Sequence, residues 1–251
     1  MRKSHQGVWN IVRFNWHFYV LAIVMSLGAL GLSFLTSALI QYLLLFTAFM
    51  IVFTSIVSLL VSYYVYDCSN LYKLKFLDQL IILPEENLVN IHAGFDETSV
   101  LLKEKFKTVS LSVLDFYDPH KHTEVSIKRA RKAYPPFPNT QKTTTHQLPL
   151  KTASVDVITL IFSVHEIRDA DEREVFFKEL YRVLKPTGKI IIVEHLRDVP
   201  NFLAYTIGFL HFYSKNTWLP LFTKTNFTLE KEQKVTPFVS SFTLNKNAIT
   251  S

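Results

Sequence analysis

From Phe14 to Tyr66 the chain runs for 53 residues without a lysine, arginine, aspartate or glutamate. A soluble domain does not contain such a stretch. As one helix, at about 1.5 Å per residue, it would be about 80 Å long, whereas the hydrocarbon core of a bilayer is about 30 Å thick. The run therefore predicts a transmembrane hairpin, with spans over about residues 16–35 and 39–64 joined by the polar pair Thr36-Ser37.

Basic residues on either side of this run give the hairpin an orientation. Arg2, Lys3 and Arg13 precede the two spans and Lys73 and Lys75 follow them, whereas the short connecting loop contains none. Lysine and arginine near membrane spans are retained on the cytoplasmic side. Both ends of the hairpin, and the domain that follows it, are therefore expected in the cytoplasm.

An N-terminal apolar stretch can also be a secretory signal, which here would be cleaved near Thr36-Ser37-Ala38. A second and longer apolar stretch follows at once, so the sequence favours the hairpin over the signal. Cys68 is the only cysteine, which excludes a disulfide within the chain and agrees with a reduced cytoplasm.

The remaining 185 residues, from Asp67 onward, hold 24 basic and 21 acidic side chains. This length suffices for one domain with its own core, and so small a basic excess does not favour a nucleic-acid-binding surface. We expect a membrane segment over residues 1–67, a connecting helix over 68–85 and a domain over 86–251. The connecting helix is predicted from apolar residues at helical spacing. They are Leu71, Leu74, Leu77, Leu80 and Ile81.

Within residues 86–251, short β-rich runs alternate with helical patterns. The β-rich runs cover residues 88–91, 109–114, 143–147, 155–162 and 189–193, and the helical patterns cover 97–106, 124–133 and 171–184. This alternation predicts βαβ units with right-handed crossovers and a parallel sheet, which is a Rossmann-like, doubly wound α/β fold. The runs at 155–162 and 189–193 are apolar throughout, as expected for strands covered on both faces.

Two similar polar segments follow the last two of these runs, His165-Glu166-Ile167-Arg168-Asp169 and Glu194-His195-Leu196-Arg197-Asp198. In an open α/β sheet the ligand lies beyond the carboxyl ends of the strands, so adjacent strands would bring both segments to the site. Histidine can act as a general base, and arginine can hold an anionic group. We expect His165 as the first candidate base and His195 as the second, with Arg168 or its counterpart in the second segment orienting the substrate. The alternative is a closed network of ion pairs that only holds the strand ends.

The same side chains also allow a metal site as an alternative. Histidines and carboxylates occur close together at His120, His122 and Glu124 and in the two polar segments, and such groups can hold a divalent ion. The sequence contains no compact ligand motif such as His-Glu-x-x-His. We therefore expect no metal.

Four segments occur in an order that is typical of one family. They are Leu88-Val89-Asn90-Ile91-His92-Ala93-Gly94, Asp115 after the second run, Leu148-Pro149-Leu150 with Ala153 to Ile158 after it, and Phe177 to Ile190 with the sequence FKELYRVLKPTGKI. In this order they resemble the class I S-adenosylmethionine-dependent methyltransferases, in particular the branch that includes quinone-biosynthesis enzymes. The resemblance covers about residues 86–246, and its last segment is similar to the family's helix, tight turn and fifth strand.

The resemblance implies a seven-stranded, Rossmann-like methyltransferase sheet that ends in an antiparallel pair over 227–232 and 238–244. It also implies S-adenosyl-L-methionine as the cofactor. The residues at the matching positions are Asn90, His92, Gly94 and Asp96 in the first loop, Asp115 after the second strand, Thr144 before the fourth strand and Ser163 after it. The carboxylate of Asp115 can accept both ribose hydroxyls, and a helix cap is the alternative role for it.

The first loop departs from the family's pattern. Asn90, His92 and Asp96 occupy positions where an acidic residue and two glycines are usual, and only Gly94 remains as a glycine. Glycine lets the backbone approach a bound cofactor closely. Side chains at His92 and Asp96 either crowd the cofactor or replace a backbone contact by a hydrogen bond.

Two further segments bear on the membrane. Lys128-Arg129-Ala130-Arg131-Lys132 is either a solvated helix face or a surface that attracts anionic lipid headgroups. The apolar and aromatic stretch over residues 202–212 is too short for a span. It is either a core helix of the domain or a segment that covers a lipophilic pocket or enters the membrane interface.

The sequence as a whole predicts a membrane-anchored methyltransferase that faces the cytoplasm. The anchor indicates a hydrophobic small molecule, such as a lipid or a quinone precursor, as the substrate, because an enzyme fixed beside a bilayer gains little for a freely soluble one. The alternative is a methyltransferase-fold membrane protein that has lost catalysis and acts as a binding or scaffold module. The glycine-poor first loop favours this alternative, and the polar strand ends favour the enzyme.

Overall fold

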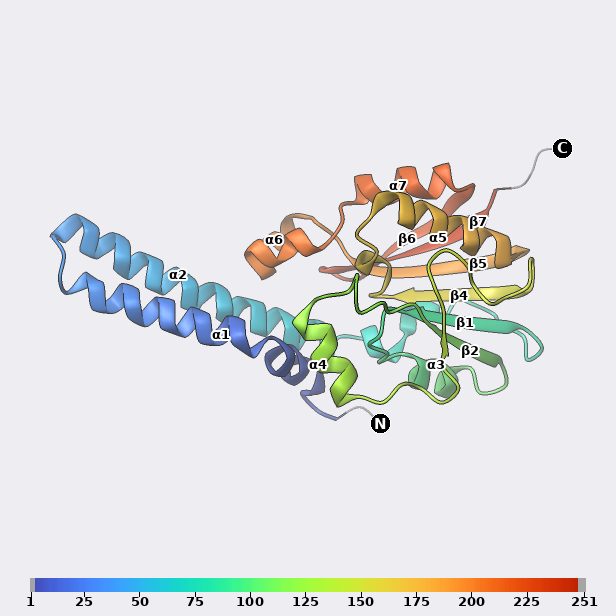
Figure 1. Ribbon diagram of the computed structural model, residues 1–251, viewed down its shortest axis with the longest axis horizontal. Coiled ribbons are helices and arrows are strands. Elements are labelled where there is room, and N and C mark those ends of the chain that lie inside the picture. Colours follow the sequence, from blue (N-terminus) through green and yellow to red (C-terminus); the bar gives the residue numbers. More distant parts are fainter. Residues whose placement is uncertain (1–2, 248–251) are drawn as a thin grey trace.

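The computed structural model describes residues 3–247 and consists of a helical hairpin that projects from one end of an α/β domain (Figure 1). The hairpin helices are α1 (Gln6–Ser33) and α2 (Ala38–Tyr63). Both lie in segments that are long and apolar enough, by length and composition, to cross a membrane. Many of their large apolar side chains are exposed, for example Leu39 at 72% and Phe46 at 61%. The two helices that the charge-free run predicts are therefore present.

Helix α1 has two parts that meet at Asn15, where the backbone leaves the helical region with φ −115° and ψ 19°. Before this kink, Gly7, Asn10 and Phe14 are buried, whereas most of the apolar side chains beyond it are exposed. The side-chain amide of Asn15 donates to the carbonyl of Ile11, 3.1 Å away, and this local bond competes with the helical ladder. The first turns of α1 therefore pack on the domain, and the apolar part begins after the kink.

The structure does not form the predicted connecting helix over residues 68–85. Helix α2 continues into a π-helical turn, and two 3-10 turns follow. They are η1 (Tyr64–Cys68), η2 (Leu71–Lys73) and η3 (Lys75–Leu77). Leu74 lies between the two 3-10 turns in the left-handed region, with φ 51°, so the helical path is broken there.

The leucine spacing explains both the prediction and its failure. Leu71, Leu74 and Leu77 are almost fully buried, and residues three apart share one face of a 3-10 helix as well as of an α-helix. Ile81, which the predicted helical stripe included, is 87% exposed. The stripe therefore ends with the second 3-10 turn.

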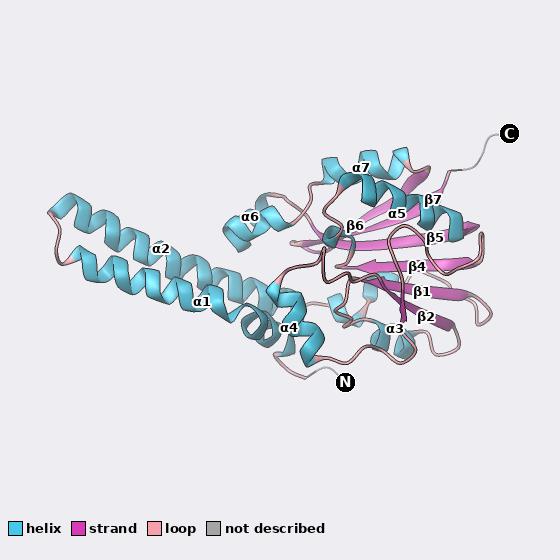
Figure 2. Ribbon diagram, viewed as in Figure 1, coloured by secondary structure: helices cyan, strands magenta, loops and turns pink. Residues whose placement is uncertain are grey.

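The α/β domain contains a seven-stranded sheet in the order β3-β2-β1-β4-β5-β7-β6 (Figure 2). The strands are β1 (Asn87–His92), β2 (Ser110–Asp115), β3 (Gln141–Lys142), β4 (Val155–Ile161), β5 (Leu184–His195), β6 (Phe227–Thr236) and β7 (Val239–Lys246). Strands β1 to β5 pair in parallel, and β7 pairs antiparallel with both β5 and β6. The predicted doubly wound sheet with a final antiparallel pair is confirmed.

Helices and short turns complete the domain. They are α3 (Ser99–Lys105), α4 (Val125–Ala133), η4 (Val164–Glu166), α5 (Ala170–Val183), α6 (Val199–Tyr205), η5 (Thr206–His211) and α7 (Lys215–Lys224). Side chains of α5 and α7 belong to the larger hydrophobic core on one face of the sheet. Leu102 of α3 and the buried leucines of η2 and η3 belong to a second core on the other face. The sheet is therefore covered on both sides, as its apolar strands predict.

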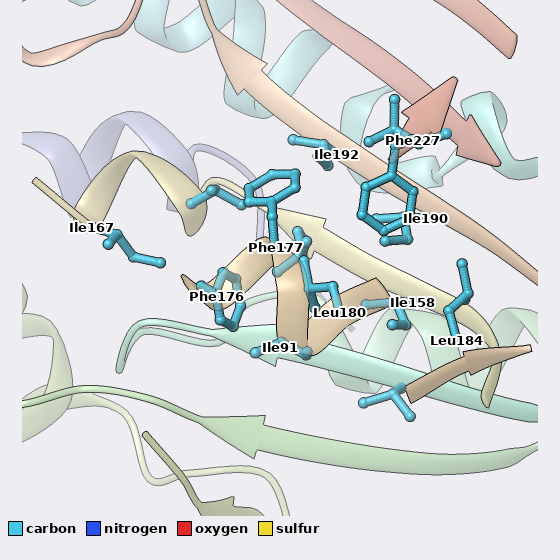
Figure 3. Close-up of a cluster of buried hydrophobic side chains, with 14 of the residues drawn as sticks. Ile91, Ile158, Ile167, Phe176, Phe177, Leu180, Leu184, Ile190, Ile192 and Phe227 are labelled. Atoms are coloured by element: carbon cyan, nitrogen blue, oxygen red, sulfur yellow. The ribbon is translucent and has the colours of Figure 1, made fainter. Parts of the chain in front are cut away.

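The larger core fixes helix α5 against the central strands of the sheet (Figure 3). Phe176, Phe177 and Leu180 of α5 are fully buried against Ile158 and Ile190 of the central strands. Burying each such side chain contributes about 1.5–3 kcal/mol. Within β5, a Cβ on Gly188 would lie 2.8 Å from Leu184 and 2.9 Å from the carbonyl oxygen of Asp156, so only glycine fits this position of the strand.

The predicted third strand over residues 143–147 is wrong, because β3 covers only Gln141–Lys142. Threonine favours strands, but the hydroxyls of this segment bond within the loop and to helix α5 instead. Thr143 donates to the carbonyl of Gln147 at 3.1 Å, and the Thr145 hydroxyl donates to the carboxylate of Glu172. These bonds close a loop where the composition predicts a strand.

The apolar stretch over residues 202–212 is not a core helix. It contains the end of α6 and the 3-10 turn η5, and Leu203, Ile207 and Leu210 are 65%, 82% and 56% exposed. In Figure 1, α6 lies beside the domain end of α2. The exposure therefore favours the second alternative for this stretch, a segment that covers a lipophilic pocket or enters the membrane interface.

Candidate active site

A cavity of about 230 Å³ lies at the carboxyl ends of β1, β4 and β5. It is beside the point between β1 and β4 where the strand order reverses, and open α/β sheets bind ligands there. Its lining comes from the sheet edge, the start of α1 and the segment after α2. The lining includes Asn10, Phe14, Tyr66, Phe95, Glu97, Phe162, His165, Glu166, His195 and Phe212. The hairpin thus supplies part of the cavity wall.

Two sets of contacts hold the start of α1 at the cavity. The backbone N–H groups of Gly7 and Val8 donate to the carboxylate of Asp67 at 2.7 and 2.8 Å, which caps the helix. Arg129 of α4 donates to the carbonyl of Phe14 at 2.6 Å. This cation of the basic run therefore serves packing within the chain, and not a solvated face or a lipid headgroup.

His92 and Gly94 shape the first loop. Gly94 has φ 97°, and its N–H donates to Nδ1 of His92 at 3.0 Å, which leaves the ring hydrogen on Nε2. Burial lowers the pKa of His92, so its imidazole is neutral at neutral pH. Nε2 is buried and has no hydrogen-bond partner among the described residues. A polar group of a ligand would satisfy it.

Asn90 and Asp96, two further predicted cofactor residues, have structural partners. Asn90 is buried inside the domain, where its amide donates to Ser99 at 2.8 Å and its Oδ1 accepts from Thr159 at 2.8 Å. Oδ1 of Asp96 accepts from the N–H groups of Thr98 and Ser99, both at 2.9 Å, at the start of α3. The second oxygen of Asp96 is buried and unpaired within the described part of the chain. Neither Asn90 nor Asp96 is among the residues that line the cavity.

Asp115 lies at the end of β2 as predicted, but both of its oxygens are engaged. Oδ1 accepts from the N–H of Tyr117 at 2.9 Å, and Oδ2 accepts from Arg131 at 2.7 Å. Arg131 also donates to the carbonyl of Gly94 at 3.1 Å and lies 4.2 Å above the Tyr117 ring. A Cβ on Gly94 would meet Arg131 at 2.7 Å. The guanidinium therefore bridges the two segments that the cofactor is predicted to contact.

Thr144 and Ser163 do not face the cavity as predicted. Thr144 is exposed in the loop after β3, and its carbonyl accepts from Thr143. Ser163 is buried and donates to the carbonyl of Ile91 at 3.0 Å, which ties the end of β4 to β1. Neither belongs to the cavity lining.

His165 does line the cavity, but its charge state is not that of a base. Its Nδ1 lies 2.6 Å from Oε2 of Glu194, and its Nε2 lies 3.3 Å from Oε1 of Glu166. Burial alone would lower the pKa of His165, but these two carboxylates raise it to about 10. The two carboxylates therefore favour the protonated imidazole at neutral pH, whereas a general base must start unprotonated, so this arrangement does not favour His165 as the first base.

His195 has the opposite environment. Its ring lies between Phe162 and Phe212, with centroid distances of 5.2 and 4.8 Å. Burial lowers its pKa to about 4, so the imidazole is neutral at neutral pH. Nδ1 lies near two acceptors, Oδ1 of Asn201 at 3.1 Å and the carbonyl of Phe238 at 3.0 Å, and therefore carries the hydrogen. Nε2 then accepts the hydroxyl hydrogen of Tyr66, 2.8 Å away.

The two arginines of the polar segments bind the backbone. Arg168 donates to the carbonyl of His211 at 2.7 Å, and Arg197 donates to the carbonyls of Leu210 and Phe212 at 2.5 and 2.8 Å. Arg168 is not part of the cavity lining. Both side chains hold the segment that ends at residue 212. This arrangement favours the alternative of a network that holds the strand ends over the prediction that an arginine orients the substrate.

The histidines that suggested a metal site are separated. His122 accepts from the N–H of Asp118 at 2.8 Å and stacks on Tyr117, and His120 is exposed. His165 and Glu166 instead meet His211, which comes from the end of η5. The ligand atoms of these three residues lie within 4.8 Å of one another.

The strand order, the antiparallel seventh strand and the cavity at the carboxyl ends of β1 and β4 define the fold of the class I S-adenosylmethionine-dependent methyltransferases. Residues 118–192 match the family model of a methyltransferase domain. The fold of the described residues and this partial match agree with the resemblance to class I methyltransferases.

Curated relatives place the chain near quinone methyltransferases. A ubiquinone/menaquinone biosynthesis C-methyltransferase UbiE from Rickettsia bellii is 28% identical over 155 residues, which are 58% of this chain and 57% of that protein. A UbiE protein from Rubrivivax gelatinosus is 39% identical over 67 residues, 24% of this chain and 26% of that protein. The chain thus spans little more than half, or less, of the length of these relatives.

Among solved structures, the PH0226 protein from Pyrococcus horikoshii superposes with a TM-score of 0.50 at 18% identity. The match covers 68% of this chain and 86% of that protein. At this identity the likeness concerns the fold alone.

Proposed function

We propose that the chain is a membrane-anchored, S-adenosylmethionine-dependent methyltransferase whose acceptor is a lipophilic, quinone-like molecule. One observation carries the proposal: the cavity at the methyltransferase site is walled by the start of α1, the helix whose apolar part follows at once. Asn10 and Phe14 of α1 line it together with Phe162 and His195 of the sheet edge. An acceptor with an apolar tail would reach such a cavity from a bilayer.

The exposed surface of the hairpin supports the membrane location. Apolar area costs about 25 cal/mol per Å² in water, and the apolar side chains of α2 are largely unburied. Helix α6 lies beside the domain end of α2 (Figure 1). Leu203 of this helix and Ile207 of the following turn are exposed and would lie at the membrane interface. The basic residues on either side of the run favour a cytoplasmic domain.

The first loop offers groups for the cofactor, which supplies the methyl group when bound. Nε2 of His92 and the free oxygen of Asp96 are buried donor and acceptor atoms with no partner in the described chain, and a polar ligand would pair with them. The carboxylate of Asp115 would hold the ribose hydroxyls once Arg131 turns away. The Arg131 side chain is 30% exposed on a short surface helix, so it can turn without unfolding the site.

Tyr66 and His195 would handle the proton of the acceptor. Methylation on the oxygen of a phenol releases its hydroxyl proton. Methylation on a ring carbon releases the proton of that carbon and is assisted by transient loss of the hydroxyl proton. The oxygen of Tyr66 would accept that proton while the Tyr66 hydrogen passes to Nε2 of His195, which is unprotonated at neutral pH. Phe162 and Phe212 cover both faces of the imidazole and exclude water.

The runner-up is a methyltransferase-fold membrane protein that acts as a binding or scaffold module. The bridge from Arg131 to Asp115 and Gly94 favours it, because this bridge fills the place predicted for the cofactor. In that case Arg131 would be a permanent part of the packing. The two proposals differ in whether S-adenosylmethionine displaces the guanidinium.

Both proposals can be tested with the full-length protein in lipid nanodiscs. We expect S-adenosylmethionine to bind by calorimetry in the wild type and to bind much more weakly in Asp115→Asn. With methyl-labelled cofactor and a prenylated hydroquinone, label should enter the lipid-extractable product. If the wild-type protein shows no heat and no thermal shift with the cofactor, the scaffold proposal replaces the enzyme.

A further inference from the structure

We propose that His165, Glu166 and His211 form a binding site for one divalent transition-metal ion at the edge of the cavity. Oε1 of Glu166 lies 3.3 Å from Nε2 of His165 and 3.7 Å from Nε2 of His211. Separations of this order are those between neighbouring ligands around one ion whose metal–ligand bonds are about 2.0–2.2 Å. Two imidazoles and one carboxylate are a donor set that zinc and iron(II) use in proteins.

The orientation of both rings is the main argument. Nδ1 of His165 lies 2.6 Å from Glu194, and Nδ1 of His211 lies 3.0 Å from Glu124. Each histidine therefore has a carboxylate on one nitrogen and directs the other nitrogen to Glu166. A second carboxylate on the far nitrogen is the usual way in which proteins orient a metal-binding histidine. Here the arrangement occurs twice around one point.

Hydrogen bonds to buried groups hold His165 and its partner Glu194 in place. Glu194 is fully buried in β5, and its other oxygen accepts from the N–H groups of Val164 and His165 at 2.9 and 3.3 Å. This fixes the carboxylate against η4, the turn that carries His165 and Glu166. His211 comes from a different segment, and Arg168 holds its carbonyl in place.

The charges around the site also favour a cation. Glu124, Glu166 and Glu194 lie around His165 and His211, so three carboxylates stabilise a cation there, either the proton on the imidazole or a metal ion that replaces it. Arg168 is the competing cation, with its Nη2 2.8 Å from Nε2 of His211. Its side chain is 40% exposed, so the guanidinium can turn outward when an ion enters.

The metal site lies at the cavity, so the ion would take part in the reaction if the proposed function holds. His165 and Glu166 line the cavity. Three protein ligands leave at least one coordination position open, as catalytic zinc sites do. That position would bind an oxygen of the acceptor, which narrows the substrate class to molecules with a hydroxyl or an enol on the reacting ring.

Metal binding can be measured without cofactor or acceptor. The full-length protein in detergent is stripped with a chelator and titrated with Co²⁺, whose visible absorption reports nitrogen and oxygen ligands in a site of low coordination number. We expect one Co²⁺ per chain, displaced by Zn²⁺. His211→Ala and Glu166→Gln should weaken binding by about 100-fold or more, and Glu194→Gln by about 10–100-fold.

His120→Ala is the matched control, because this histidine is exposed and lies outside the cluster. It should leave Co²⁺ binding unchanged. Thermal unfolding of each stripped variant separates loss of the site from loss of the fold. The proposal is overturned if the folded wild-type protein binds Co²⁺ no more tightly than folded His211→Ala. Intact metal binding without methyl transfer would instead contradict the proposed function and leave the site in place.

Discussion

Replacing Arg131 by methionine should make S-adenosylmethionine bind more tightly. In the structure the guanidinium donates to Asp115 at 2.7 Å and to the Gly94 carbonyl at 3.1 Å, and both groups are predicted to meet the cofactor. Binding must therefore break these contacts before new ones form. Methionine keeps the length of the side chain and removes the charge and the donors.

The size of the effect follows from the bridge. A hydrogen bond to a charged group contributes about 1.5–3 kcal/mol, and partial exposure of the Arg131 side chain reduces this to about 1–2 kcal/mol. Since about 1.4 kcal/mol corresponds to a factor of ten, Arg131→Met should lower the dissociation constant about 5–30-fold. The cofactor-free variant should lose about the same 1–2 kcal/mol of stability, because the buried carboxylate of Asp115 then lacks its partner.

Calorimetric titration of wild type and variant in the same nanodiscs measures this difference. Lys132→Met is the control, because Lys132 is an exposed cation on the same helix and should leave the affinity unchanged. Equal or weaker binding by Arg131→Met would refute the reasoning. It would mean that Arg131 contacts the cofactor itself, or that the guanidinium never leaves Asp115.

Three further predictions concern the rest of the site. Tyr66→Phe should lower the rate of methyl transfer about 10²-fold or more and leave cofactor affinity unchanged, as measured with the labelled acceptor assay, because the hydroxyl that passes the proton is lost. The folded pKa of His195, about 4, lies below its unfolded value of about 6.5, so stability is fully present above pH 6.5 and falls by about 3 kcal/mol as the pH drops to 4. Thermal unfolding from pH 7.5 to 4 should show this loss, and His195→Gln should show a smaller one. Gly94→Ala should destabilise the protein by about 1–3 kcal/mol in the same assay, because φ is 97° and the Cβ would meet Tyr117 at 2.9 Å; an unchanged melting temperature would contradict this.

The sequence predicts the sheet well because every βαβ unit has an apolar strand and an amphipathic helix of its own. Each apolar strand and each amphipathic helix is recognised from its own residues, and the order of units then restricts the topology. The two incorrect predictions, the connecting helix and the third strand, concern short segments whose residue patterns are compatible with more than one local structure. Leucines three apart at Leu71, Leu74 and Leu77 fit an α-helix and a 3-10 turn equally, and the threonines over 143–147 fit a strand and a loop.

The candidate site is predicted in position but not in role. His92, Asp115, His165 and His195 lie at the strand ends where the order of segments puts them. Their roles depend on partners that lie far away in the sequence or have no special pattern around them. Glu166 and the distant Glu194 stabilise the protonated form of His165, whereas burial keeps His195 neutral, and neither the contribution of Glu194 nor the burial can be derived from the adjacent residues.

Several functional candidates were not anticipated for the same reason. Tyr66 stands among the aromatic residues that flank an apolar run, His211 lies in an apolar stretch, and Arg131 is one of four cations among five residues. The only sequence signal for His211 is that it is the single ionisable residue within residues 202–212 apart from Tyr205. A search for lone polar residues in exposed apolar segments would have found it.

The hairpin of α1 and α2 is also part of the candidate site, because residues at both of its ends line the cavity. Tyr66 follows α2 directly and provides the hydroxyl at His195, and Phe14 of α1 forms part of the cavity wall. Asp67 caps the start of α1, so the two ends of the hairpin are joined to each other at the cavity. A displacement of either helix relative to the domain therefore changes the cavity itself. Under the proposed function, Tyr66 and His195 would be brought together only when both helices are in place, which would tie the chemistry to the membrane-bound form of the protein.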